Sequence, residues 1–256
     1  MSIYITGDIH GNPSRLSVDS FYEQKTFSAN KDENTVIILG DFGLVWNRNG
    51  EDKNESYWLD WLESKPFTTV FVDGNHECHP RLNNYPIKEW NGGLTNEIRP
   101  HVLRLRRGEI FNIEGKKFFA FGGASSHDIQ DGILDYNDEN WRDQAKKLDK
   151  QGKYMYRIKG LSYWSEELPN PDEMNDGIAN LEEHNWKVDY IITHSPPASV
   201  IALLGQGLYE QDKLTEYLEF IRQNTEYKKH LMGHMHINRA MNDKDILIYE
   251  QIIRII

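Results

Sequence analysis

Short apolar runs recur along this chain, and each is followed by an Asp, Asn or His residue, in most cases beside a glycine. The first run, residues 3–6, is rich in β-branched and aromatic residues and has no helical period, so it predicts a β-strand. Similar runs stand at residues 36–39, 70–72, 190–192 and 231–232. The segments between the early runs are long enough for crossover helices, which predicts a parallel sheet in an α/β protein. Ligands of such sheets lie at the carboxyl ends of the strands, so the polar residues there are the candidate site.

The segments between the apolar runs carry helix signals. Pro13 stands where the first turn of a helix tolerates proline, which predicts a helix over residues 12–27. Residues 55–64 place aromatic and apolar side chains at helical spacing, and we interpret this stripe as core packing. Further helices are expected over residues 139–150, 163–168, 171–186 and 212–223.

Beyond Pro80 the pattern changes to strands. Residues 101–106 alternate between apolar and polar side chains, and residues 110–113 and 116–121 predict a hairpin. The last residues, 246–256, are also strand-like. The arginines of the middle region could form a phosphate-binding edge, but we interpret them as a solvent-exposed strand face. They are Arg99, Arg104, Arg106 and Arg107.

A chain of 256 residues is expected to form a single domain, here with an insertion at about residues 131–171. The insertion is polar and rich in Tyr and Trp, and no catalytic motif stands in it. We interpret it as a helical lid over the site that stacks on a ring of the substrate. The alternatives are a contact between two copies in a homodimer, or a satellite core. Flexible points are expected in a later loop, at residues 205–207.

Charge and composition restrict the partners. The formal net charge of -11, from 29 Lys and Arg against 40 Asp and Glu, repels nucleic acid at long range, so no stable nucleic-acid binding is expected. No run approaches the roughly 20 apolar residues of a membrane span. The first strand begins directly at the N-terminus, which leaves no room for a signal peptide, and the lone Cys78 fits a reducing compartment. We therefore expect a cytoplasmic protein with no membrane partner.

Residues that could bind metal stand at the strand ends. Asp8 and His10 are spaced i and i+2, which in an extended segment points both side chains the same way. A carboxylate beside an imidazole forms half of a metal site, and the other half is expected in the later blocks. These blocks are Gly40-Asp41, Gly74-Asn75-His76, Thr193-His194 and Gly233-His234-Met235-His236.

Taken in order, the blocks resemble the motifs of the calcineurin-like metallophosphoesterase superfamily. That pattern is Asp-x-His, Gly-Asp, Gly-Asn-His, a lone His and Gly-His-x-His, and it spans residues 8–236 here. The resemblance implies a fold in which two packed mixed β-sheets are flanked by helices. It also implies two metal ions. One ion would take Asp8, His10 and His236, the other would take Asn75, His194 and His234, and Asp41 would bridge them.

The chemistry implied by this resemblance is hydrolysis of phosphate esters by a hydroxide that bridges the metals. His76 would donate a proton to the leaving group, and its alternative role is a structural partner of Asp41 or of phosphate. Nitrogen and oxygen ligands without thiolate suit Mn, which we expect, and also Fe, Zn, Ni or Co. His127 and Asp128 follow a Gly-Gly-Ala turn that relatives carry beside the site. They are either groups around the metals and substrate or ordinary loop residues.

Glu77 and Cys78 are expected to begin a helix, with Glu77 in its first turn, where the helix dipole favours an acidic side chain. Cys78 and His79 are not expected to be further metal ligands, because the two-metal set is already complete.

One departure from the superfamily bears on the substrate. In its serine/threonine protein phosphatases, the second block continues to an Asp-Arg pair that orients the histidine and grips phosphate. Here that block continues as residues 42–46 without such a pair. A small-molecule or nucleotide phosphomonoesterase or phosphodiesterase is therefore favoured. A protein phosphatase and a non-catalytic scaffold of the same fold stay as alternatives. The His-x-His-x-Asp-His run of zinc β-lactamases is absent.

Overall fold

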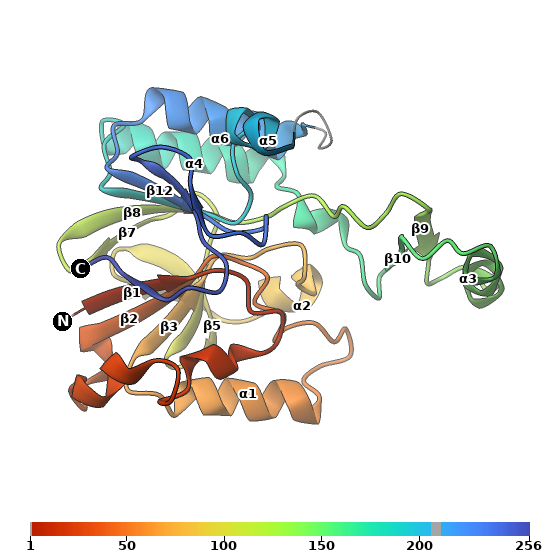
Figure 1. Ribbon diagram of the computed structural model, residues 1–256, viewed down its shortest axis with the longest axis horizontal. Helices are drawn as coiled ribbons and strands as arrows, with labels where there is room; N and C mark the ends of the chain where they lie inside the picture. The colour runs from red at the N-terminus through yellow and green to blue at the C-terminus, as the bar shows by residue number, and fades with distance from the viewer. Residues whose placement is uncertain (1, 206–210) are drawn as a thin grey trace.

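Two mixed β-sheets pack face to face in this computed structural model, which describes residues 2–205 and 211–256 (Figure 1). The first sheet has the order β15-β1-β2-β3-β6-β5-β4. Its members are β1 Ser2–Thr6, β2 Asn34–Ile38, β3 Thr68–Phe71, β4 Ile87–Trp90, β5 Gly93–Arg99, β6 Val102–Leu105 and β15 Ile253–Arg254. Strands β1, β2, β3 and β6 run parallel, as predicted, and the remaining strands are antiparallel additions at the edges.

The second sheet has the order β13-β14-β12-β11-β8-β7. Its members are β7 Ile110–Ile113, β8 Lys116–Phe121, β11 Tyr190–Thr193, β12 Lys229–Met232, β13 Arg239–Ala240 and β14 Asp245–Leu247. The predicted hairpin is present as the antiparallel pair β7 and β8, and β8, β11, β12 and β14 are parallel. The fold predicted by resemblance, two packed mixed sheets flanked by helices, is confirmed.

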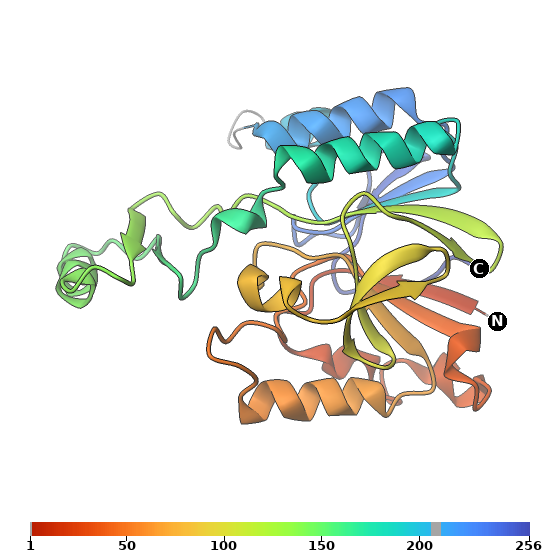
Figure 2. The same ribbon diagram turned by 180° about the vertical axis from the view of Figure 1, so that it is seen from behind.

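Side-chain alternation along the strands decides which layer each residue joins. In β1, Ile3 and Ile5 enter the core between the two sheets, together with Leu231 of the second sheet. Tyr4, between them, faces the opposite way and belongs to the core beneath α1 Lys53–Glu63. The outer face of the second sheet is covered by α4 Pro171–Glu183 and α6 Lys213–Asn224 (Figure 2). These helices agree with three of the predicted segments, and the result is a helix–sheet–sheet–helix arrangement.

The helix predicted over residues 12–27 is wrong. Two 3-10 turns stand there instead, η1 Pro13–Leu16 and η2 Tyr22–Thr26, separated by an extended residue at Ser17. The Asn12 side chain accepts a hydrogen bond from the Ser14 N–H, and the Ser17 carbonyl accepts one from Phe21. The bond to the Asn12 side chain competes with a continuous helix, whereas the Ser17–Phe21 bond joins two backbone groups and closes a single turn. Phe21 is fully buried and edge-on to Tyr4, which fixes the turn against β1.

The interpretation of the arginines at residues 99–107 as a solvent-exposed face is wrong for two of the four, Arg104 and Arg107. Arg104 and Arg107 are buried, and both bind the fully buried Asp73 carboxylate, at 2.8 and 2.5 Å. Arg99 pairs with Glu51 and Asp60 on the surface. A segment that looks solvated in sequence therefore contributes two buried cations, and these hold the loop after β3.

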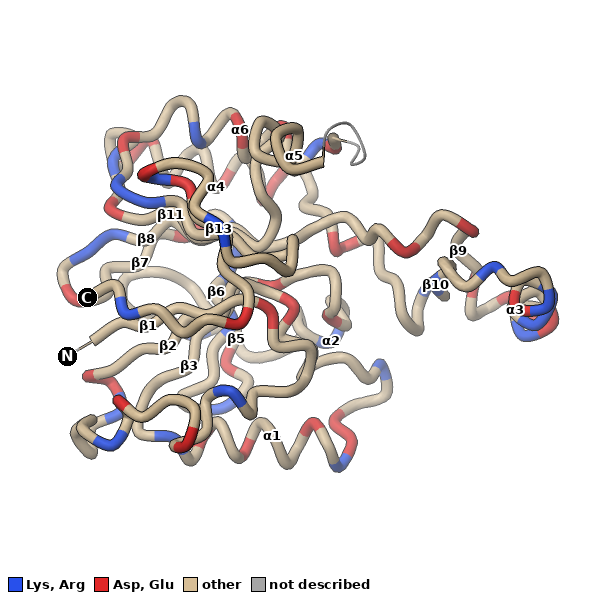
Figure 3. The backbone as a smooth tube through the Cα atoms, viewed as in Figure 1, with Lys and Arg blue, Asp and Glu red and all other residues tan. Residues whose placement is uncertain are grey.

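The insertion projects from the body as an arm (Figures 1 and 2). It consists of β9 Gly132–Asp135, α3 Trp141–Lys150 and β10 Tyr156–Lys159, and β9 and β10 pair in parallel. Helix α3, at the far end, carries side chains of both charges (Figure 3). The helix expected over residues 163–168 is only the 3-10 turn η4 Ser165–Glu167.

Three further expectations concern shorter segments. The strand-like C-terminal segment is divided between β14 and β15. Of the expected flexible points, Gly205 ends α5 Ala198–Gly205, whereas residues 206 and 207 lie outside the described residues. No helix in the described part of the chain is long and apolar enough to span a bilayer.

Candidate metal centre

The loops at the carboxyl ends of the parallel strands in both sheets bring the predicted ligands together. Asp8 follows β1, Asp41 follows β2 and Asn75 follows β3, while His194 follows β11 and His234 follows β12. Because these strands are parallel within each sheet, their ends meet at one edge.

The predicted ligands fall into two groups by distance. Potential ligand atoms of Asp8, His10, Asp41 and His236 all lie within 4.8 Å of one another, and so do those of Asp41, His194 and His234. Asp41 is common to both groups. This is the arrangement that a carboxylate shared by two cations requires, because its two oxygens can bind one cation each.

Asn75 provides a separate indication that the site fits a cation. Its side-chain oxygen, Oδ1, is buried and has no hydrogen-bond partner among the described residues. Leaving a buried carbonyl oxygen unpaired is costly, and a cation would satisfy it. The donor set of carboxylate, amide and imidazole groups suits a divalent transition metal.

The backbone is strained at the candidate ligands. His10, Asp41, His234 and His236 have φ values of 45°, 43°, 67° and 49°, in the left-handed region that non-glycine residues rarely adopt. Strain of this kind costs about 1–3 kcal/mol per residue and gathers at functional sites.

Two of the glycines beside the ligands are explained by close packing. A Cβ atom on Gly74 would overlap the Asp41 carboxylate, and one on Gly40 would overlap the His194 ring. Gly40 also has a φ of +94°. The glycines therefore let two loops approach within van der Waals distance of the ligands.

Electrostatics favour positive charge at the centre of the site. Burial alone would lower the pKa of His194, but the carboxylates of Asp41 and Asp8 outweigh it and raise that pKa to about 10. The two carboxylates thus attract a proton that a bound cation would replace. Burial lowers the pKa of His234 well below its usual value, and the neutral imidazole is the form that binds metal.

Glu77 supports the loop that carries Asp41. Its buried carboxylate accepts hydrogen bonds from the N–H groups of Phe42, Gly43 and Gly74, at 2.8, 3.0 and 3.3 Å. The expectation that Glu77 lies in the first turn of a helix is wrong, because α2 His79–Asn83 begins two residues later. His79 is buried against Asp73 and the Gly74 carbonyl, and Cys78 is buried as well. Neither belongs to the two groups of potential ligands.

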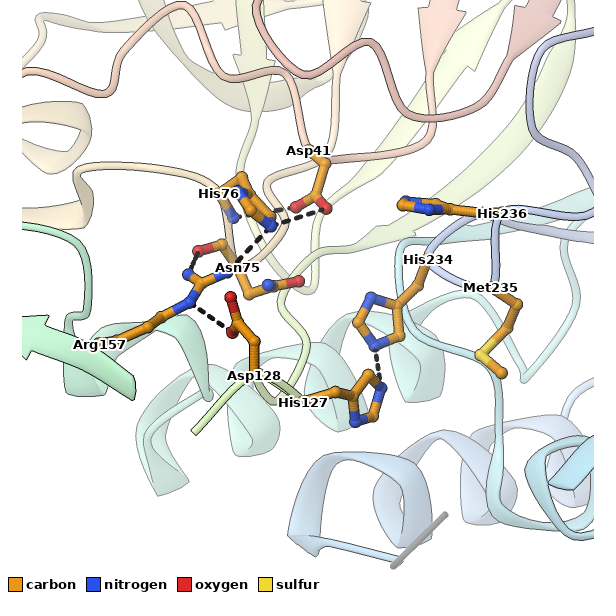
Figure 4. Close-up of a pocket in the computed structure, with 9 residues that line it drawn as sticks. All are labelled: Asp41, Asn75, His76, His127, Asp128, Arg157, His234, Met235 and His236. Atoms are coloured by element: carbon orange, nitrogen blue, oxygen red, sulfur yellow. Dashed lines mark hydrogen bonds and ion pairs between the residues drawn. The ribbon is translucent and has the colours of Figure 1, made fainter. Parts of the chain in front are cut away.

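A cavity of about 270 Å³ opens beside the ligands (Figure 4). It is lined by Asp41, Asn75, His76, His127, Asp128, Arg157, His234, Met235 and His236. His127 and Asp128 thus both reach the cavity, and Nε2 of His127 lies 2.8 Å from Nε2 of His234.

His76 lines the cavity next to Asp41. Its Nε2 is 4.0 Å from Asp41 Oδ2, and its backbone N–H donates to Asp41 Oδ1 at 2.9 Å. Its ring stacks on Trp46, with 5.6 Å between centroids, and Trp46 in turn meets Trp164 edge-on. Burial first, and then the nearby Arg157 cation, lower the pKa of His76 to about 4, against the opposing effect of Asp41.

Arg157 is the functional-site residue that the sequence does not reveal. It lies on β10 of the insertion, yet its Nη2 is 3.0 Å from Nε2 of His76 and its Nε donates to Asp128 Oδ1 at 2.5 Å. The local sequence Tyr-Arg-Ile-Lys is an ordinary short strand with no motif around the arginine. Arg157 is one of several Lys and Arg residues in this segment, and nothing in the sequence sets it apart from the others.

Comparison with known proteins decides the family. The family model of calcineurin-like phosphoesterases matches residues 1–238. The chain belongs to this family. The calcineurin-like phosphoesterases are metal-dependent hydrolases of phosphate esters that use two metal ions, and the two groups around Asp41 could hold such ions.

The individual relatives are distant. A lariat debranching enzyme of Danio rerio is 23% identical over 248 residues, which is 88% of this chain and 35% of that protein. A fructan 1-exohydrolase of Bromus pictus is 28% identical over 107 residues, or 41% of this chain and 16% of that protein. The solved phosphopantetheinyl hydrolase of Mycobacterium tuberculosis is 13% identical with a TM-score of 0.44, covering 97% of this chain and 88% of that one. The chain thus spans about a third or less of the length of these two sequence relatives.

Proposed function

We propose that this phosphoesterase hydrolyses small-molecule or nucleotide phosphate esters with two metal ions. Asp8, His10 and His236 would hold one ion, Asn75, His194 and His234 would hold the other, and Asp41 would be shared by both. The observation that carries the proposal is the membership of the Asp41 carboxylate in both groups of ligand atoms.

The bound ions supply an activated water and neutralise charge on the phosphate oxygens. The chain supplies the rest of the chemistry. His76 lines the cavity beside Asp41, and in its protonated form its Nε2 would donate a proton to the departing alkoxide. Trp46 stacks on the His76 ring and restricts its orientation. His127 and Asp128, on the opposite wall, hold His234 and Arg157 in place.

The substrate class rests on size and charge. A cavity of about 270 Å³ admits a phosphate group with a small part of its ester substituent. The net charge of -11 disfavours a nucleic-acid polymer, although one distant relative is named a lariat debranching enzyme. Mn is the metal we propose first, with Fe, Zn, Ni and Co as alternatives that the same nitrogen and oxygen donors accept.

The test uses the protein purified in the presence of Mn, with metal content measured by elemental analysis. Hydrolysis of p-nitrophenyl phosphate and bis-p-nitrophenyl phosphate is then compared between the wild type, Asp41→Asn and the control Asp19→Asn. Asp19 is an exposed carboxylate outside both groups of ligand atoms. We expect two ions per chain, loss of bound metal and activity in Asp41→Asn, and no change in the control. One ion per chain, or full activity in Asp41→Asn, would refute the two-metal proposal.

A further inference from the structure

Arg157 enters the candidate metal centre from the insertion. The arm returns to the body through β10, and the Arg157 side chain lies in the cavity wall with only 5% of its residue surface exposed (Figure 4). A guanidinium remains charged at every physiological pH, so its burial here brings a permanent positive charge to the site.

Two of the three guanidinium nitrogens of Arg157, Nε and Nη1, donate hydrogen bonds to acceptors of the protein other than His76. Nε donates to the Asp128 carboxylate at 2.5 Å, and Nη1 donates to the carbonyl of Ser162 at 3.1 Å. The Asp128 side chain is itself half exposed. These bonds fix the plane of the guanidinium and direct Nη2 toward the cavity.

The group that accepts a hydrogen bond from Nη2 is a weaker acceptor than the Asp128 carboxylate. It is the neutral imidazole nitrogen of His76, at 3.0 Å. A phosphate oxygen carries a negative charge, so it attracts the guanidinium more strongly than the neutral imidazole nitrogen does. A phosphate in the cavity would therefore compete with His76 for Nη2, and its arrival would leave the lone pair of His76 Nε2 free to take up the proton that the leaving group needs.

From this geometry we propose that Arg157 binds the phosphate group of the substrate and gives the site a preference for monoesters over diesters. The proposal rests on the function proposed above. A monoester phosphate offers three non-bridging oxygens and close to two negative charges, whereas a diester offers two such oxygens and one charge. The Arg157 cation therefore contributes more to the binding of a monoester than to the binding of a diester, because the monoester has one more non-bridging oxygen and a larger negative charge.

The alternative is structural. Arg157 also spans from the arm to the main chain of Asn75, whose carbonyl lies 3.5 Å from Nη1, so it could serve only to fasten the arm and orient His76. In that role it would act through His76, and its removal would affect all esters alike without changing phosphate binding.

The experiment compares Arg157→Ala, Arg157→Lys and the control Lys159→Ala in the Mn-loaded protein. Lys159 is an exposed cation on the same strand and does not line the cavity. Three quantities are measured: metal content, the dissociation constant of inorganic phosphate by calorimetry, and kcat/KM for p-nitrophenyl phosphate and bis-p-nitrophenyl phosphate.

For Arg157→Ala we expect unchanged metal content, phosphate binding weakened about 10- to 100-fold, and a similar loss of kcat/KM for the monoester. The diester should lose about threefold or less, and Lys159→Ala should match the wild type. Arg157→Lys, which keeps the charge but not the planar fork, should fall between.

Two outcomes would overturn the inference about Arg157. Phosphate binding equal to wild type in Arg157→Ala would do so, as would equal losses for the two esters. If Arg157→Ala is unfolded in a thermal melt, Arg157→Lys decides by the same criteria. A wild type that neither binds phosphate nor hydrolyses either ester would instead refute the proposed function itself.

Discussion

Nε2 of His194 lies 3.2 Å from Oδ1 of Asp41, and both side chains are almost completely buried. His194 follows a strand of the second sheet and Asp41 a strand of the first, so this pair joins the two sheets at the site. The candidate ligands therefore come together only when the two sheets are packed against each other.

This pair predicts how the stability of the metal-free protein depends on pH. The pKa of His194 is 6.5 when unperturbed and about 10 in the folded protein, since Asp41 and Asp8 outweigh the effect of burial. A raised pKa stabilises the folded state fully below pH 6.5, and this contribution is lost as the pH rises toward 10. We expect the melting temperature in EDTA to fall between pH 7 and pH 10.

His194→Gln provides the matched control, because it keeps a polar side chain but cannot take up the proton. It should flatten this part of the pH profile. Saturation with Mn should also flatten it, since the cation replaces the proton. An unchanged slope in His194→Gln would show that another group causes the dependence.

His76→Ala should retain both metal ions but lower kcat by about 10²–10⁴, the usual range for a lost general acid. The loss should shrink for good leaving groups such as p-nitrophenolate, which need no proton. Steady-state kinetics with phenyl and p-nitrophenyl phosphate measure this difference. His184→Ala serves as the control, because His184 does not line the cavity. Equal losses for the two substrates would assign His76 to phosphate binding.

Gly74→Ala should disrupt the metal centre without adding any polar group. Its Cβ would overlap the Asp41 carboxylate, so either the carboxylate or the loop must move. We expect less than two bound ions per chain, and destabilisation of about 1–3 kcal/mol from overpacking. Metal analysis and urea unfolding test both effects.

Gly152→Ala is the comparison for this variant. Gly152 lies on the arm with open space around its Cβ position and a φ of +72°, so only backbone strain should result. Normal metal content in Gly74→Ala would contradict the packing argument.

Asp73→Asn should strongly destabilise the fold. The fully buried Asp73 carboxylate pairs with Arg104 and Arg107, and these cations hold its pKa well below the usual range despite burial. Removing one partner of a buried ion pair costs about 3–5 kcal/mol, because the other charge stays buried. Denaturant unfolding measures the loss.

The contrasting variant is Asp60→Asn, which breaks the exposed pair with Arg99. Such surface pairs contribute about 0–1 kcal/mol. Similar losses of stability in Asp60→Asn and Asp73→Asn would show that burial does not govern the strength of these pairs.

The sequence alone determined the elements that depend on local pattern. The parallel strands, the hairpin of β7 and β8 and the helices α1, α4 and α6 follow from side-chain spacing. The grouping of Asp8, Asp41 and His194 was also predictable, because parallel strands bring their carboxyl ends to one edge and each ligand stands directly after a strand. Their role as metal ligands stays a prediction.

Only the tertiary structure decided which cations are buried and which residues complete the cavity. Arg104 stands in the alternating segment 101–106 and Arg107 follows that segment directly, and only the position of Asp73 shows that both are internal. Arg157 is 81 positions from His76 along the chain. It reaches the site because the chain returns from the arm to the body through β10, which pairs in parallel with β9. Contacts of this kind depend on how distant segments pack, and no spacing along the chain encodes them.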